Sequence, residues 1–209
     1  MRRTTEIFLR STFALLFVLV ALFQQGCATS PPGPATETLT SPCGDCVRGV
    51  VNFAKVSPSL WRGSQPTAEG FRDLEAAGVR TVINFRHDHD DSKLLAGTNL
   101  KYVRIRTYAW NPKEADLVSF FRVMKNPDNW PVFVHCNKGQ DRVGFYTAAY
   151  RIVIDGWSAD DAIWELFQFK YNPIWYRIPV VLRQIDVEKL KAQVAASLSV
   201  ASSPSEAAP

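Results

Sequence analysis

The sequence has no marked excess of one charge and no internal repeat. Its 209 residues carry 24 basic and 20 acidic side chains, which gives a formal net charge of +4 at pH 7. Three arginines and one glutamate of this total lie in residues 1–27, so the rest of the chain is closer still to neutral. Such a balance argues against a nucleic-acid-binding protein. The length and the 46% hydrophobic content suit a chain with one main folded domain.

The apolar run near the N-terminus is too short to cross a membrane. It spans residues 13–23, eleven residues, whereas a membrane-crossing helix needs roughly 20. Arginines precede it and small residues follow it, so residues 1–27 are predicted to be a bacterial export signal. Cys27 follows Gly26 in a stretch that resembles a lipobox, although Gln24 stands where leucine is usual. Lipid on Cys27 would anchor the protein at the membrane of the cell envelope, whereas an ordinary signal-peptidase cut would release it into the periplasm.

Proline, threonine and serine dominate the segment after the signal, and the C-terminal segment has the same character. Residues 28–47 are predicted to be a flexible tether and residues 200–209 a disordered tail, because neither can bury enough apolar surface to order itself. Residues 48–199 remain as the folded domain. Cys43 and Cys46 have the spacing of a redox motif or of half a zinc site, but the chain has only four cysteines and lacks a second such pair. A small structural disulfide is therefore favoured.

Within the domain, runs of strand-forming residues alternate with helix signals. Strands are expected at residues 59–62, 81–85, 102–105 and 131–135, and helices at residues 67–78, 111–124, 142–154, 158–169 and 181–196. Thr67, Asn111 and Ser158 stand where helix N-caps are expected. This alternation predicts an α/β layered fold with a central, mostly parallel sheet flanked by helices.

The residues with the clearest chemical meaning lie between the last expected strand and the helix after it. They read His-Cys-Asn-Lys-Gly-Gln-Asp-Arg over residues 135–142. A loop at a helix N-terminus gathers backbone N–H groups and the positive end of the helix dipole, which suits a phosphate and favours the thiolate of Cys136. Gly139 permits a tight turn, and Arg142 offers two parallel donors to phosphate oxygens. These residues predict attack of Cys136 on phosphorus and hydrolysis of the phosphocysteine by water, with no metal or other cofactor.

This loop resembles the C-x5-R signature of the cysteine-based protein tyrosine and dual-specificity phosphatases. Residues 56–66 and 78–86 are similar to the strand, Gln-Pro turn and second strand of the bacterial dual-specificity-like branch. The resemblance implies a phosphatase-like layered fold and hydrolysis of a phosphorylated protein, lipid or small molecule. It implies Cys136 as nucleophile, Arg142 as phosphate clamp and His135 as support for the thiolate. The implied phosphate-binding residues are Cys136, Asn137, Lys138, Gly139, Gln140, Asp141 and Arg142.

The residue after the arginine departs from the family pattern. A serine or threonine is usual there and helps the thiolate leave during hydrolysis of the phosphoenzyme, but this chain has Val143. The loss of one such hydrogen bond would slow that step roughly ten- to a hundredfold. A phosphate-binding protein without turnover is therefore one alternative. A rhodanese-type sulfurtransferase is another, although His135 and Arg142 favour phosphorus over sulfane sulfur.

The general acid of the family is also missing from its usual loop, since residues 98–112 contain no carboxylate. The remaining candidates are Glu114 and Asp116, at the start of the next helix, and Asp141 within the signature loop. Each has a structural alternative. Glu114 would close a capping box, Asp116 would favour the helix N-terminus, and Asp141 would pair with a basic group.

Two further groups of residues could contribute to the site. Residues 87–91 alternate histidine and aspartate, and they are predicted to form a solvated charged turn, because ligands so close in sequence cannot all converge on one metal ion. This turn could still border the pocket, with Asp88 as a further candidate acid.

The aromatic residues near the C-terminus are expected to pack in the core or between helices, or else to offer one ring to an aromatic phosphoester: Trp164, Tyr171, Trp175 and Tyr176.

Overall fold

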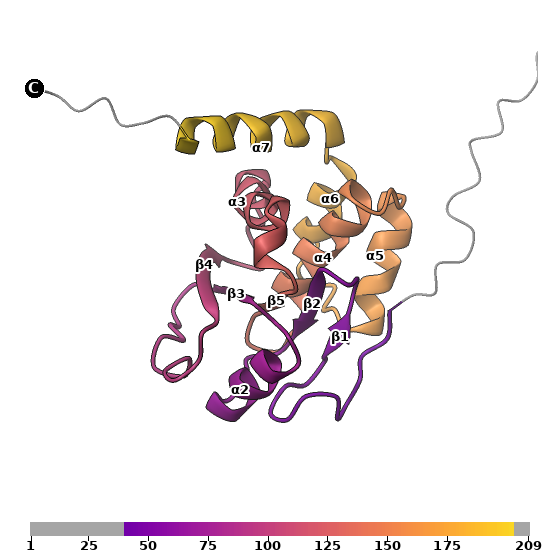
Figure 1. Ribbon diagram of the computed structural model, residues 1–209. Helices are drawn as coiled ribbons and strands as arrows, with labels where there is room; N and C mark the ends of the chain where they lie inside the picture. The colour runs from indigo at the N-terminus through magenta and orange to yellow at the C-terminus, as the bar shows by residue number, and fades with distance from the viewer. Residues whose placement is uncertain (1–39, 203–209) are drawn as a thin grey trace, which may run out of the picture. The chain divides into compact units, whose positions relative to one another are not determined.

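The computed structural model describes residues 40–202, which fold around a five-stranded sheet (Figure 1). The strands are β1 (Ala54–Lys55), β2 (Leu60–Gly63), β3 (Thr81–Arg86), β4 (Lys101–Thr107) and β5 (Val132–His135). Their order across the sheet is β1-β2-β5-β3-β4. β1 pairs antiparallel with β2, and the other neighbours pair parallel. The predicted α/β fold with a mostly parallel sheet is confirmed.

Helices cover both faces of this sheet. They are α2 (Ala68–Ala76), α3 (Glu114–Lys125), α4 (Asp141–Val153), α5 (Ala159–Gln168), α6 (Arg177–Arg183) and α7 (Val187–Ser202), with a short 3-10 helix, η1 (Pro127–Asn129). In Figure 1, α2 lies on one side of the sheet and α3 to α7 lie on the other. Within residues 40–202, no helix combines the length and hydrophobicity needed to cross a membrane.

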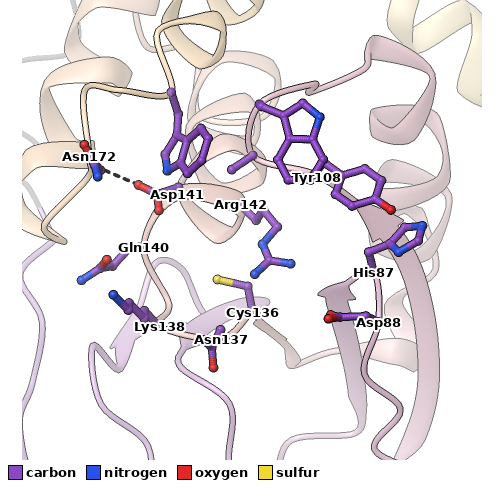
Figure 2. Close-up of a pocket in the computed structure, with 13 residues that line it drawn as sticks. His87, Asp88, Tyr108, Cys136, Asn137, Lys138, Gln140, Asp141, Arg142 and Asn172 are labelled. Atoms are coloured by element: carbon purple, nitrogen blue, oxygen red, sulfur yellow. Dashed lines mark hydrogen bonds between the residues drawn. The ribbon is translucent and has the colours of Figure 1, made fainter.

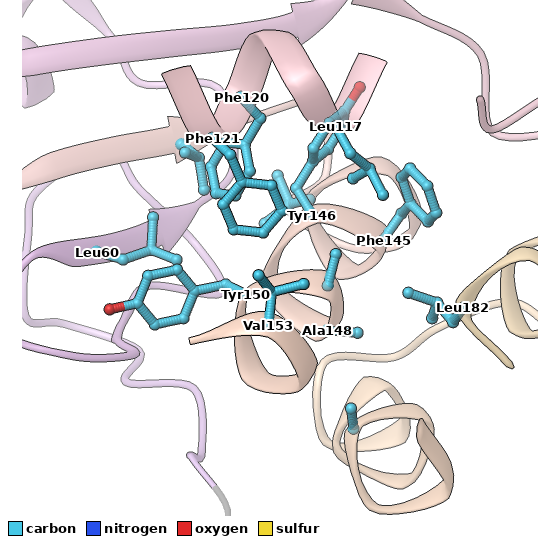
Figure 3. Close-up of a cluster of buried hydrophobic side chains, with 14 of the residues drawn as sticks. Leu60, Leu117, Phe120, Phe121, Phe145, Tyr146, Ala148, Tyr150, Val153 and Leu182 are labelled. Carbon is cyan, nitrogen blue, oxygen red and sulfur yellow. The ribbon is translucent and has the colours of Figure 1, made fainter. Parts of the chain in front are cut away.

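The domain has two clusters of buried apolar side chains, and the buried strand β5 contributes side chains to both. Successive side chains of a strand point to opposite faces, so Phe133 packs in the cluster that contains Phe71 of α2. Val132 and Val134 pack in the larger cluster, which contains Phe120 of α3 (Figure 3). All three β5 residues are fully buried, as their continuous apolar run predicted.

Two of the three predicted helix caps are confirmed. The side chain of Thr67 accepts a hydrogen bond from Gly70 N at the start of α2, and that of Ser158 accepts one from Asp161 N at the start of α5. The prediction for Asn111 is wrong. Asn111 N donates to Tyr108 O at 3.2 Å and closes a separate turn, and α3 starts only at Glu114.

The ends of the domain also differ from expectation. The helix predicted over residues 181–196 is two helices, α6 and α7, and α7 extends into the segment expected to be a tail. Asp186 separates them and acts as a cap, because its Oδ1 accepts from Lys189 N at 3.0 Å.

At the other end, residues 40–47, expected in the tether, pack on the domain. Thr40 N donates to Glu165 Oε1 at 2.9 Å, Val47 is buried, and Cys43 and Cys46 form the favoured disulfide. The predicted export signal, Cys27 and the rest of the tether lie outside the described residues, as does the end of the tail.

Candidate active site

The signature loop lies where parallel strands end, which is where open α/β sheets bind ligands. It joins β5 to α4 and borders a pocket of about 510 Å³ (Figure 2). Loops after β3, β4 and α5 complete the walls. The lining residues are Cys136, Asn137, Lys138, Gln140, Asp141 and Arg142 of the loop and of the start of α4, with His87, Asp88, Tyr108, Ala109, Trp110, Asn172 and Trp175.

The carbonyl groups of this loop are held away from the pocket by residues of other segments. Asn137 O accepts from Gln65 N at 3.1 Å, and Lys138 O accepts from Asn52 Nδ2 at 2.9 Å. In a planar trans peptide the N–H points opposite to the C=O. The N–H groups that follow these carbonyls are therefore turned toward the pocket side, where they form a cradle suited to an anion.

The next carbonyl, that of Gly139, is held by a buried arginine that was not among the predicted site residues. Arg62 of β2 is fully buried, and its guanidinium donates to Gly139 O and to Thr147 Oγ1, each at 2.9 Å. It also lies 3.6 Å from the centre of the Phe169 ring. Burial lowers the pKa of Arg62 to about 10, which leaves it charged at neutral pH. A single arginine in an otherwise apolar strand was the signal that could have identified it.

Gly139 makes the tight turn that the sequence predicted. Its φ is +67°, in the left-handed region, and a Cβ there would lie 2.5 Å from the carbonyl carbon of Gly63 and 2.7 Å from Ser64 N. No side chain fits so close to backbone atoms, so the loop can rest on the end of β2 only with glycine at this position.

A buried histidine–carboxylate contact supports the loop from the side of β3. His135 Nε2 lies 2.9 Å from Asp91 Oδ2, and both side chains are fully buried. Gln65 Nε2 donates to Asp91 Oδ1 at 2.7 Å. Burial alone would raise the pKa of Asp91, but the hydrogen bond and charge of His135, together with Gln65, outweigh it and leave the pKa below its usual value.

The prediction that residues 87–91 form a solvated turn is therefore wrong at Asp91. The turn folds back on the sheet, where Asp91 N donates to Tyr102 Oη at 2.9 Å, and this brings the last carboxylate of the turn beneath the loop. His87 and Asp88, at the start of the turn, line the pocket.

The candidate acids fall into two groups. Asp88 and Asp141 line the pocket, and Asp141 Oδ1 accepts from Asn172 N at 2.8 Å (Figure 2). Glu114 and Asp116 are absent from the pocket lining. Glu114 Oε1 lies 3.4 Å from Lys189 Nζ of α7. Burial raises the pKa of Asp116.

Cys136 and Arg142 face the same space. Both residues line the pocket, and in Figure 2 the guanidinium of Arg142 comes down from the start of α4 toward the loop that carries the sulfur of Cys136. Cys136 is the free cysteine of residues 40–202, and it is 3% exposed. Val143 is fully buried in the cluster that also contains Cys136, and as a valine it has no hydroxyl group to donate to the sulfur. No three His, Cys, Asp or Glu side chains of the described chain converge on a metal position.

Aromatic rings form one wall of the pocket. His87 stacks on Tyr108 with 4.1 Å between ring centres, Tyr108 lies 4.1 Å from Trp110, and Trp110 lies 6.4 Å from Trp175. Of the C-terminal aromatic group, Trp175 lines the pocket and Tyr171 is buried as expected, whereas the expectation of core packing is wrong for the exposed Trp164 and Tyr176. Tyr108 and Trp110 were missed, although two aromatic residues directly after a strand at this sheet edge were a usable signal.

Comparisons with known proteins agree with this site. Residues 50–171 match the family model described as DSP-PTPase phosphatase fused to NAD+ kinase. The dual specificity protein phosphatase TpbA of Pseudomonas aeruginosa is 32% identical over 75% of this chain and 73% of its own length. A crystal structure of TpbA superposes with a TM-score of 0.65 at 26% identity, covering 77% of this chain and 98% of the other. A second, of a TpbA variant in complex with phosphotyrosine, gives 0.59 at 28% identity over 68% and 90%. The chain therefore belongs to the cysteine-based dual-specificity and tyrosine phosphatases and is a phosphomonoesterase of that type.

Proposed function

We propose that Cys136 is the nucleophile and Arg142 the phosphate clamp of this phosphatase. The observation that carries the proposal is the loop around Cys136, whose carbonyls are bonded to residues outside the pocket and whose Cys136 and Arg142 line one pocket. Donors aimed at one point stabilise both a thiolate and the charge on the phosphoryl oxygens in the transition state. The sulfur attacks phosphorus, the S–P bond forms as the ester P–O bond breaks, and water then hydrolyses the phosphocysteine to phosphate and free thiolate.

Asp141 is the proposed general acid. It is the predicted candidate that lines the pocket within the signature loop, next to Arg142, whereas Glu114 and Asp116 lie outside the lining. A protonated Asp141 would donate to the leaving oxygen during formation of the phosphocysteine, and its carboxylate would then accept a proton from the attacking water. Asp88, on the opposite side of the pocket, is the rival candidate.

Phosphotyrosine is the proposed substrate group. The wall formed by Tyr108, Trp110 and Trp175 offers ring faces and edges to an aromatic leaving group, and such pairs contribute roughly 0.5–1.5 kcal/mol beyond area burial. The phosphotyrosine complex of TpbA supports this choice. An aliphatic phosphoester would gain less from the same wall.

Steady-state hydrolysis tests the residue roles. Wild-type protein should release phosphate from phosphotyrosine and an aryl phosphate, while Cys136→Ser should not turn over. Equal rates for the two proteins would remove Cys136 from the mechanism. Asp141→Asn should abolish the basic limb of the kcat profile against pH, and Asp88→Asn should retain it. The reverse pattern would transfer the role of acid to Asp88.

We also propose that the protein is exported and held at the cell envelope by lipid on Cys27. The support is the sequence pattern of residues 1–27 and the Cys43–Cys46 disulfide, a bond typical of oxidising compartments. Metabolic labelling with a fatty acid should mark the wild-type chain and not Cys27→Ser. Unlabelled wild-type protein in the soluble periplasmic fraction would favour the ordinary signal peptidase, and retention in the cytoplasm would refute export.

A further inference from the structure

Large apolar side chains are exposed beside the pocket, on α5, on the loop after it and on α6. Five of them define what we call the α5–α6 surface: Trp164, Phe167, Ile174, Tyr176 and Val180. Each side chain is between 45% and 70% exposed. Single exposed apolar residues are ordinary, but five large ones between residues 164 and 180 make this stretch a candidate interaction site.

This surface is continuous with the pocket through aromatic contacts. The ring centres of Trp164 and Phe167 are 5.9 Å apart, and those of Phe167 and Tyr171 are 5.5 Å apart. Tyr171 Oη donates to Trp175 O at 2.8 Å, and Trp175 lines the pocket opposite Trp110. Ile174 and Tyr176, the exposed neighbours of Trp175 in the chain, therefore stand beside the pocket, where a ligand held against Trp175 can reach them.

The surface carries Asp160 and Asp161 near Trp164, but its part nearest the pocket, the loop after α5 and the start of α6, is positive. Residues 166–182 contain no aspartate or glutamate, whereas Lys170 and Arg177 are exposed. Neither basic side chain forms an ion pair within residues 40–202. The surface therefore combines apolar contact with two free cations, and it fits a partner that presents apolar and acidic side chains together.

We propose that the α5–α6 surface binds the residues that flank phosphotyrosine in a protein substrate, a segment with apolar and acidic side chains. This inference rests on the proposed function. With the phosphoryl group at Cys136 and the ring against Trp175, the chain that carries the ring leaves the pocket toward this surface. A protein segment fits better than a bilayer, because the pocket rim also carries the exposed polar residues Asp88 and Lys138, which a flat apolar phase would desolvate.

Peptide kinetics with the full chain test the proposal. The probes are a phosphotyrosine peptide with leucine and glutamate on both sides, the same peptide with serine in place of each leucine, and free phosphotyrosine. Wild-type protein should show a KM about tenfold lower for the leucine peptide than for the serine peptide, the effect of partly burying one or two apolar side chains. Ile174→Ser and Tyr176→Ser should each remove most of that advantage and leave the kinetics on free phosphotyrosine unchanged.

Ile154→Ser is the matched control, because Ile154 is also exposed, at 54%, but lies at the other end of α4 from the pocket. It should keep the peptide preference. Equal KM values for both peptides in wild type would overturn the proposal while hydrolysis of free phosphotyrosine still upheld the proposed function. Sedimentation with anionic phospholipid vesicles that Ile174→Ser weakens, without any change in peptide KM, would assign the surface to a membrane and overturn the proposal as well. Absence of hydrolysis on all three probes would refute the proposed function itself.

Discussion

Replacement of Asp91 by asparagine tests the buried support of the signature loop. Asp91 and His135 are both fully buried, with 2.9 Å between the carboxylate oxygen and the ring nitrogen, and Gln65 donates to the second carboxylate oxygen. The asparagine side chain would keep the volume and one acceptor for Gln65, but it would remove the charge that faces His135. The substitution therefore isolates the electrostatic part of this contact.

The expected loss of stability follows from these contacts. Removal of a charged hydrogen-bond partner from a fully buried polar group costs roughly 3 kcal/mol or somewhat more. Because asparagine retains one hydrogen bond, worth roughly 1 kcal/mol, we expect a loss of about 2–4 kcal/mol in the free energy of unfolding at pH 7. A domain of this size should then melt at a temperature lower by roughly 5–15 °C.

The loss should depend on pH in a definite direction. The folded state holds the pKa of Asp91 below its usual value, so the carboxylate contributes stability above the unfolded pKa of roughly 3.9 and loses it as the pH falls through the folded pKa. Urea unfolding at pH 7 and at successively lower pH should show wild type and Asp91→Asn converging in acid. Asp88→Asn, at an exposed carboxylate of the same turn, should match wild type throughout. A difference below about 0.5 kcal/mol at pH 7, or one that does not shrink in acid, would refute the reasoning.

Three further substitutions test the loop itself. Gly139→Ala should lower stability by more than about 2 kcal/mol, because it combines a left-handed φ with contact against the backbone of Gly63, and an unchanged melting temperature would contradict this. Asn52→Gly keeps the left-handed backbone, φ +53°, but removes the bond to Lys138 O, so kcat/KM should fall about five- to tenfold with little change in melting temperature. Val143→Thr should raise kcat about tenfold and abolish a pre-steady-state burst of product if hydrolysis of the phosphocysteine limits wild type; a wild type without a burst would show that this step is not limiting.

The signature loop was predictable because its signals are local. A buried strand, a glycine, an arginine and a helix start stand within a few residues of each other, and the structure places the loop where that sequence indicates. Arg62 and Asp91 were not predictable in the same way, since they lie more than 40 residues before Cys136. Their contacts depend on the strand order, in which β5 lies between β2 and β3, so that the ends of both neighbours reach the loop.

Helix boundaries were predicted less well, although their sequence signals are also local. The Asn-Pro sequence before α3 has the residues of a capped helix start, but the chain uses Asn111 to close a turn that carries Trp110 to the pocket. α7 continues past the predicted end at residue 196, where Leu198 still packs against the core that contains Phe121 of α3. In both cases tertiary contacts outweigh the propensity of the segment.

The outward-held carbonyl groups of the loop have a consequence for the energetics of binding. Gln65, Asn52 and Arg62 fix the orientation of three successive peptide groups through hydrogen bonds within the protein itself. The dipoles that meet an incoming phosphate are thus already aligned. The entropy cost of aligning them is part of the free energy of folding and does not weaken phosphate binding. Inorganic phosphate should consequently raise the melting temperature while leaving the amide exchange of the surrounding strands essentially as it was.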